Sequence, residues 1–212
     1  MARIAVIGGT GYAGSNIVAE AVSRGHSVVS IARSVPTERV EGAIYLEGTI
    51  LDVAGLVEQL QEVDVVIQAI SPRGNMAGKV RPATAELFAA LDDSVRLGVV
   101  GGAGGSLVAP GGARVIDSGF PEEFKAEALE AIGVLEDLQQ TPETKDWFFV
   151  HPAGGFGAWA PGERTGIYRD GGSVLVTDDK GESFISGRDL GCAFVDEIEN
   201  PRHRRENFAV GY

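Results

Sequence analysis

Three glycines near the N-terminus are the first residues whose spacing indicates chemistry. Gly8, Gly11 and Gly14 form a G-x-x-G-x-x-G pattern directly after the apolar run 3–7. Glycine permits a tight turn and a close approach of the backbone to a pyrophosphate, whose charge is met by free N–H groups at the start of a helix. On its own the pattern is weak evidence, because it departs by one residue from G-x-G-x-x-G and glycine-rich turns are common.

The residues that follow the glycines make the pattern specific. A helix expected over 12–23 places Ile17, Val18 and Ala21 on one face, and a second β-branched run follows at 28–31. Strand, turn, helix and strand together predict a βαβ dinucleotide-binding unit. The cofactor contacts expected in its turn are Gly8, Thr10, Gly11, Tyr12, Ala13 and Gly14.

The end of the second strand indicates which dinucleotide is bound. An acidic residue about 20 positions after the glycines accepts from the ribose of NAD, whereas an arginine there suits the 2′-phosphate of NADP. This position holds Arg33 and Ser34, and no acidic residue follows before Glu38. The pair predicts a preference for NADP(H) over NAD(H), with Arg33 on the phosphate and Ser34 adding a hydrogen bond. The alternative is a solvated arginine on a surface loop.

Short strands and helices alternate through the rest of the first half. Strands are expected at 43–46, 64–68 and 97–100, with one helix after Asp52 and another with Pro82 in its first turn. The pattern predicts the α/β class: a Rossmann-type, doubly wound, mainly parallel sheet flanked by helices. Because ligands gather at the carboxyl ends of such strands, further cofactor contacts are expected at Thr49, Ile50, Ala69, Ile70, Ser71 and Gly102.

The second half is less regular. A helix is expected over 121–140, a strand over 147–150, a closing helix over 189–198 and a last strand over 207–210. A long glycine-rich stretch covers 151–172, and loops of that length are usually functional or mobile. We expect one domain over 1–212, with a substrate-facing part built mainly from 151–186.

Composition excludes several classes of partner and site. The 212 residues carry a formal net charge of −12, which makes nucleic acid an unlikely ligand. The single cysteine, Cys192, excludes an internal disulfide, and the spacing of His26, His151 and His203 does not suggest a metal site. No apolar run approaches the ~20 residues of a membrane span, and no leader precedes the first strand. The chain is therefore expected to be cytoplasmic, away from membranes, and a monomer or small homo-oligomer.

Six motifs carry a resemblance to an atypical, small form of the short-chain dehydrogenase/reductase superfamily. They are G-G-T-G-Y-A-G-S-N-I at 8–17, R-S at 33–34, G-G-A-G-G-S-L at 101–107, F-K-A-E-A-L at 124–129, P-G-E-R-T-G-I-Y-R at 161–169 and I-S-G-R-D-L-G at 185–191. The chain is most similar to NmrA-like NAD(P)H-binding proteins and biliverdin-IXβ (flavin) reductases. The resemblance implies a small NAD(P)H-dependent oxidoreductase.

The chain also departs from the superfamily pattern. The usual Tyr-x-x-x-Lys is missing, because no tyrosine is followed by lysine four residues later. Thr49 and Ile50 replace the acidic adenine contact, and Gly105 is an extra glycine before Ser106. Chemistry that needs a tyrosine acid is therefore not expected.

Five residues are candidates for the reaction itself. The resemblance implies that Ser106 faces and orients the substrate and that Lys125 reaches the nicotinamide ribose; a turn serine and a lysine paired with neighbouring glutamates are the alternatives. His151, at the expected crevice mouth, is either a proton donor or a packing residue. Phe156 and Trp159 either stack on a planar acceptor or anchor their loop.

Two functions follow from these residues. The first is NADPH-dependent hydride transfer to a planar conjugated acceptor, such as a flavin or quinone, which can take its proton from solvent. The second is an NmrA-like regulator that binds NADPH without turnover, since missing catalytic residues suit it equally. Epimerase or dehydratase chemistry is less favoured, because it generally uses the absent Tyr-x-x-x-Lys.

Overall fold

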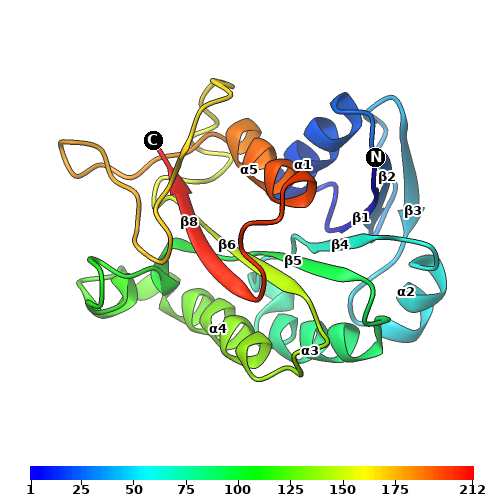
Figure 1. Ribbon diagram of the computed structural model, residues 1–212, viewed down its shortest axis with the longest axis horizontal. Coiled ribbons are helices and arrows are strands. Elements are labelled where there is room, and N and C mark those ends of the chain that lie inside the picture. The colour runs from blue at the N-terminus through cyan, green and yellow to red at the C-terminus, as the bar shows by residue number, and fades with distance from the viewer.

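A computed structural model describes residues 1–212 and contains a single sheet of eight strands (Figure 1). The strands are β1 (Arg3–Ile7), β2 (Ser27–Ala32), β3 (Ala43–Glu47), β4 (Val65–Gln68), β5 (Arg96–Val100), β6 (Trp147–Pro152), β7 (Arg169–Asp170) and β8 (Glu206–Gly211). Their order across the sheet is β3-β2-β1-β4-β5-β6-β8-β7. Neighbours pair in parallel, except that β7 pairs antiparallel with β8.

Five helices cover the two faces of this sheet. They are α1 (Tyr12–Ser23), α2 (Val53–Gln59), α3 (Val80–Ala90), α4 (Glu122–Gln139) and α5 (Gly187–Glu199). Figure 1 shows α1 and α5 side by side on one face, with α2, α3 and α4 on the other. Each face has its own apolar cluster, one centred on residues such as Ile17 and Phe194 and the other on residues such as Leu87 and Leu135.

This architecture confirms the predicted fold class and the single domain. The central strands are apolar on both sides because helices bury both faces of a parallel sheet; all four residues of β4 are buried. The strand order reverses between β1 and β4, and at such a point an α/β sheet opens a crevice beyond the carboxyl ends of its strands.

The boundaries of the expected elements agree with the sequence to within three residues. Pro82 lies in the first turn of α3, as expected. The helix α5 begins at Gly187, before the expected Asp189, because Ser186 Oγ accepts from Asp189 N at 3.0 Å and caps the helix. The two-residue β7 was not predicted, and neither were three short 3₁₀ turns: Gly74–Met76, Ala103–Gly105 and Val115–Asp117. None of the helices is both long enough and apolar enough to cross a membrane.

Candidate functional site

The glycine turn between β1 and α1 is built by three different constraints. Gly8 has a φ of +85°, which side chains rarely adopt, and its N–H donates to Ile31 O at 2.8 Å. A Cβ at Gly14 would overlap Gly8 O, so Gly14 allows α1 to pack against the turn. Gly11, by contrast, has ordinary dihedrals as the N-cap of α1, and a Cβ there would meet only Gly8 O, at 3.3 Å.

This turn has the features that a dinucleotide pyrophosphate requires. Gly11 provides no side-chain cap, so the first N–H groups of α1 remain available to an anion. Thr10 and Gly11 are exposed, and Tyr12 and Ala13 are half-buried, so the turn opens to solvent at the start of the helix. The protein therefore needs Gly8 and Gly14 for its own fold, whereas the space beside Gly11 suits a ligand.

The ends of β2 and β4 lie against this turn. Gly8 N and Gly9 N both donate to Ile31 O, and a Cβ at Gly8 would lie 2.9 Å from Ala69 O and 3.0 Å from Ile70 Cγ1. The structure thus brings the glycine turn, the β2 end and the β4 end to one edge of the sheet, as expected from sequence.

Arg33 and Ser34 follow directly after β2 and are both exposed. The Arg33 guanidinium has no hydrogen-bond or ion-pair partner within the chain. Arg39, six residues later in the same loop, instead donates from Nε to Pro36 O at 3.1 Å and lies over the Tyr45 ring. Of these two arginines, Arg33 is the one free to meet an anionic group.

Three of the expected cofactor contacts after β3 and β4 differ in exposure. Ile50 is fully buried in the apolar cluster beneath α2. Thr49 is half-buried, and its Oγ1 accepts from Leu51 N at 3.3 Å. Ser71, after β4, is exposed, and its Oγ donates to Glu127 Oε1 of α4 at 2.9 Å.

Ser106 does not face the crevice. Its side chain is 0% exposed, and Oγ has no hydrogen-bond partner. Ser106 follows the 3₁₀ turn Ala103–Gly105, and its carbonyl accepts from Val115 N at 2.8 Å. In this structure the Ser106 hydroxyl is therefore not accessible to a substrate, in contrast to the expectation from the sequence.

His151 is also buried, with 1% of its surface exposed, at the end of β6. Its Nδ1 lies 2.8 Å from Gly102 O and its Nε2 lies 3.2 Å from Asn207 Nδ2. A carbonyl only accepts, so Nδ1 carries the proton and Nε2 accepts from the amide. Burial lowers the pKa of His151 from 6.5 to about 4, an effect that the Gly102 bond only partly offsets. A neutral ring with a hydrogen bond at each nitrogen favours a packing role for His151, in which the ring holds Gly102 in place.

Lys125 lies near the start of α4 beside a shallow hollow lined by residues that include Ile116, Phe120 and Leu129. Its Nζ pairs with Glu122 Oε2 at 2.6 Å, one turn away on the same helix. Pairing with a neighbouring glutamate was the alternative to a cofactor contact for Lys125. Lys125 makes no contact with the glycine turn.

The two loop aromatics after β6 have different environments. The Phe156 ring is half-buried, and its centroid lies 5.2 Å from that of Tyr12, whereas Trp159 is 74% exposed. Phe156 therefore anchors its loop to α1, while the indole of Trp159 remains free. The Tyr12 hydroxyl donates to Pro161 O at 3.2 Å and accepts from Gly187 N at 3.1 Å.

Buried carboxylates hold the next part of the loop. Arg164 pairs with Glu20 at 2.9 Å, and Thr165 and Gly166 donate to Asp189 at 2.8 to 3.2 Å. Burial alone raises the pKa of Asp189, but hydrogen bonds from Tyr212, Thr165 and Gly166 bring it below its usual value, so the group stays ionised. Arg164 is thus occupied by the protein itself.

Sequence reasoning missed Glu20 and Asp189 as structural residues. Glu20 had one signal, because it falls on the apolar face of α1 beside Ile17 and Ala21, where a charge requires a partner. Asp189 had a weaker one, as an acidic residue in the first turn of α5. The partners of both lie far along the chain, so the pattern of either helix alone does not identify them.

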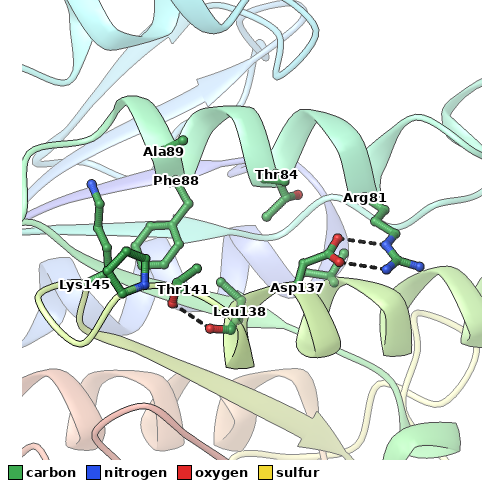
Figure 2. A pocket seen from close by; sticks show the side chains of 11 residues that line it. Arg81, Thr84, Phe88, Ala89, Asp137, Leu138, Thr141 and Lys145 are labelled. Carbon is green, nitrogen blue, oxygen red and sulfur yellow. Dashed lines mark hydrogen bonds and ion pairs between the residues drawn. The ribbon is translucent and has the colours of Figure 1, made fainter.

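A hollow of about 120 Å³ lies between α3 and α4, and Figure 2 shows the side chains that line it. Thr84, Phe88 and Leu138 line it, and the pair between Arg81 and Asp137, at 2.7 Å, closes one side. None of its lining residues comes from the glycine turn or from a segment that directly follows a strand. It is separate from the crevice at the carboxyl edge.

Comparison with known proteins identifies a family for the chain. Residues 8–200 match a family model described as NAD(P)H-binding. The chain is 34% identical over 212 residues to the uncharacterized protein YwnB of Bacillus subtilis, an alignment that covers 98% of this chain and 97% of YwnB.

Two solved structures share the whole fold. A candidate exported protein from Burkholderia pseudomallei is 37% identical with a TM-score of 0.87, covering 100% of both chains. A candidate NADH-flavin reductase from Streptococcus pneumoniae is 32% identical with a TM-score of 0.84, covering 100% of this chain and 99% of the other. With the glycine turn, the strand order and the family match in agreement, the chain belongs to the NAD(P)H-binding family.

Proposed function

We propose that the protein is an NADPH-dependent reductase that gives hydride to a planar conjugated acceptor, such as a flavin or quinone. The observation that carries this proposal is the state of the four tyrosine hydroxyls. Those of Tyr12, Tyr168 and Tyr212 donate to Pro161 O, Asp196 and Asp189, and that of Tyr45 accepts from Val40 N. Three hydroxyl protons are thus donated within the chain, the Tyr45 hydroxyl lies on β3, and His151 is neutral, so an acceptor that takes its proton from solvent fits best.

Within this proposal, the bound nicotinamide cofactor supplies the hydride. The turn around Gly11 and the start of α1 hold the pyrophosphate, and Arg33 with Ser34 binds the 2′-phosphate. Gly102, fixed by His151, and the ends of β4 and β5 border the nicotinamide, and the exposed indole of Trp159 stacks on the acceptor. The chain thus positions two rings and keeps them in contact.

A direct test is the oxidation of NADPH with lumiflavin, FMN and menadione as acceptors. We expect turnover with at least one of them, and none when Gly11 is replaced by valine. Tight NADPH binding without turnover on any acceptor would contradict the proposal and favour a regulator of the NmrA-like type. The resemblance of the chain to a candidate NADH-flavin reductase supports including flavins in the panel.

The cofactor preference is tested through Arg33. A bidentate arginine–phosphate contact is worth more than ~1.4 kcal/mol, so we expect NADPH to bind at least about tenfold more tightly than NADH. Arg33→Asp should reverse this order in titration calorimetry. Arg39→Asp is the matched control, because it makes the same charge change in the same loop at an arginine that is already bonded. Equal affinities of the wild type for NADPH and NADH would contradict the assignment of Arg33 to the 2′-phosphate.

The proposal includes a cytoplasmic location, whereas the Burkholderia relative is described as an exported protein. Fractionation of cells that express the untagged chain distinguishes the two: a cytoplasmic reductase remains with the cytosolic NADPH pool, and recovery outside the cytoplasm would contradict this part of the proposal.

A further inference from the structure

Tyr12 connects the glycine turn with the loop after β6. It is the first residue of α1, next to Gly11, so its backbone lies where the pyrophosphate is proposed to bind. Its hydroxyl reaches two distant segments: it donates to Pro161 O at 3.2 Å and accepts from Gly187 N at 3.1 Å. One side chain therefore joins the turn to the loop and to the start of α5.

The absence of a side chain at Gly187 leaves space for the Tyr12 ring at the start of α5. A Cβ at Gly187 would lie 2.8 Å from Tyr12 Cζ and 2.9 Å from its hydroxyl, so only glycine permits the contact. The Tyr12 ring also packs at a tilt against Phe156, with centroids 5.2 Å apart. Both ends of the ring are thus in contact with residues outside α1.

The loop after β6 is attached at three places, and Tyr12 provides the middle one. At its start, Gly154 N and Gly155 N donate to Ser183 at 3.0 and 2.7 Å. At its end, Arg164 pairs with Glu20 and Thr165 binds Asp189. Between these anchors lie residues 156–163, which include the exposed Trp159. In this stretch the bonds that reach α1 come from Tyr12.

We propose that Tyr12 is a positioning residue through which the cofactor, once bound at the glycine turn, fixes residues 156–163 over the acceptor site. The inference rests on the proposed function, since it assigns a role in the same site. It predicts that cofactor binds first and acceptor second. Tyr12→Phe keeps the ring against Phe156 and removes both hydroxyl contacts.

Trp159 reports the position of this loop. The chain has two tryptophans; Trp147 is 1% exposed and Trp159 is 74% exposed, so acrylamide quenching measures mainly Trp159. NADP⁺ is the probe, because its oxidised ring does not absorb tryptophan emission. In the wild type we expect NADP⁺ to lower the quenching constant about twofold, and in Tyr12→Phe we expect no change. Trp159→Phe gives the baseline from Trp147.

Kinetics supply the second measurement. Tyr12→Phe should raise KM for lumiflavin about tenfold. The Kd for NADPH should stay within about twofold of the wild type, because phenylalanine keeps the backbone N–H of residue 12 at the start of α1 and removes only the hydroxyl. Tyr168→Phe is the matched control: its hydroxyl donates to Asp196 at 2.8 Å and touches neither the turn nor residues 156–163, so the response of Trp159 to NADP⁺ should persist.

Three results would overturn the inference. They are an unchanged NADP⁺ response in Tyr12→Phe, an unchanged KM for the acceptor, and a Kd for NADPH raised more than about tenfold, which would mean that the Tyr12 hydroxyl binds the cofactor directly. Failure of the proposed function is a different result. If the wild type turns over no acceptor but Trp159 still responds to NADP⁺ through Tyr12, the coupling stands and the reductase assignment falls.

Discussion

The His151 imidazole lies at the crevice end of β6, yet its surroundings remove it from acid–base chemistry. Burial lowers its pKa from 6.5 to about 4, and both ring nitrogens are bonded, to Gly102 O and to the Asn207 amide. The sequence left a proton donor and a packing residue as alternatives, and the hydrogen bond to Gly102 O favours a packing residue that supports the loop after β5. Its charge state then affects stability.

The resulting prediction concerns stability in acid. Between pH 6.5 and about 4 the unfolded chain binds the His151 proton more readily than the folded chain, so the free energy of unfolding rises with pH in this window. The contribution of about 3 kcal/mol is complete above pH 6.5 and is lost as the pH falls toward 4. Urea unfolding near neutral pH and again near the acidic end should show a loss about 2 kcal/mol larger in the wild type than in His151→Gln. Carboxylates titrate equally in both proteins, so parallel pH profiles would contradict the prediction.

Ser106 supports a second prediction at this scale. Its hydroxyl is fully buried without a partner, so replacing it removes no hydrogen bond and relieves an unsatisfied polar group. We expect Ser106→Ala to leave the free energy of unfolding unchanged or to raise it by up to about 1 kcal/mol, as measured by urea unfolding. In the same variant kcat/KM should change less than about threefold. A loss of tenfold or more with unchanged stability would show that the hydroxyl reaches the substrate.

At the scale of elements, two glycines of the turn between β1 and α1 have different roles: Gly14 is needed for the fold, whereas Gly11 leaves space for the cofactor. Gly11→Val places its side chain where only Gly8 O is near, at 3.3 Å, and valine accepts the φ of −75°. We expect the free energy of unfolding to stay within about 1 kcal/mol, while calorimetry detects no binding of NADPH or NADH. Gly14→Val is the comparison, because its Cβ overlaps Gly8 O and should destabilise the fold by about 2 kcal/mol or more. A folded Gly11→Val that binds NADPH normally would place the pyrophosphate elsewhere.

The elements themselves were largely predictable, because periodicity is local. Runs such as 3–7 and 64–68, separated by amphipathic helices, predict a parallel sheet from neighbouring residues alone. The two-residue β7 has no such pattern and exists because it pairs with β8, 40 or so residues later in the chain. The same limit applies to the candidate site. The position of Arg33 at the end of β2 could be predicted from the order of strands along the sequence. The pairing of Arg164 with Glu20 could not, because it depends on how α1 packs against the loop after β6.

At the scale of the whole molecule, the net charge bears on which acceptors can approach the crevice. The chain carries a formal net charge of −12, and several of its cations are paired within the chain. Arg164 pairs with Glu20, Lys125 with Glu122 and Arg73 with Glu127, while Arg169 donates to Thr177 O. Arg33 is free, but the proposal assigns it to the cofactor phosphate. Arg188, in the first turn of α5, is exposed and also has no partner within the chain, so it is one cation against the net charge of the molecule. We therefore expect an anionic acceptor to meet net repulsion.

The last prediction compares two flavins that share one ring system and differ in charge. At low ionic strength we expect kcat/KM for uncharged lumiflavin to exceed that for FMN by at least about fivefold, or ~1 kcal/mol. Because the Debye length falls from about 30 Å at 0.01 M salt to about 8 Å at 0.15 M, the difference should narrow as salt is added. Glu122→Gln should also narrow it, since the variant removes one negative charge and releases Lys125 from its partner. Gln139→Glu, at the far end of the same helix, is the control for a charge change away from the crevice. A preference for FMN at low salt, or a ratio that does not respond to salt, would show that a cation of the crevice binds the acceptor phosphate after all.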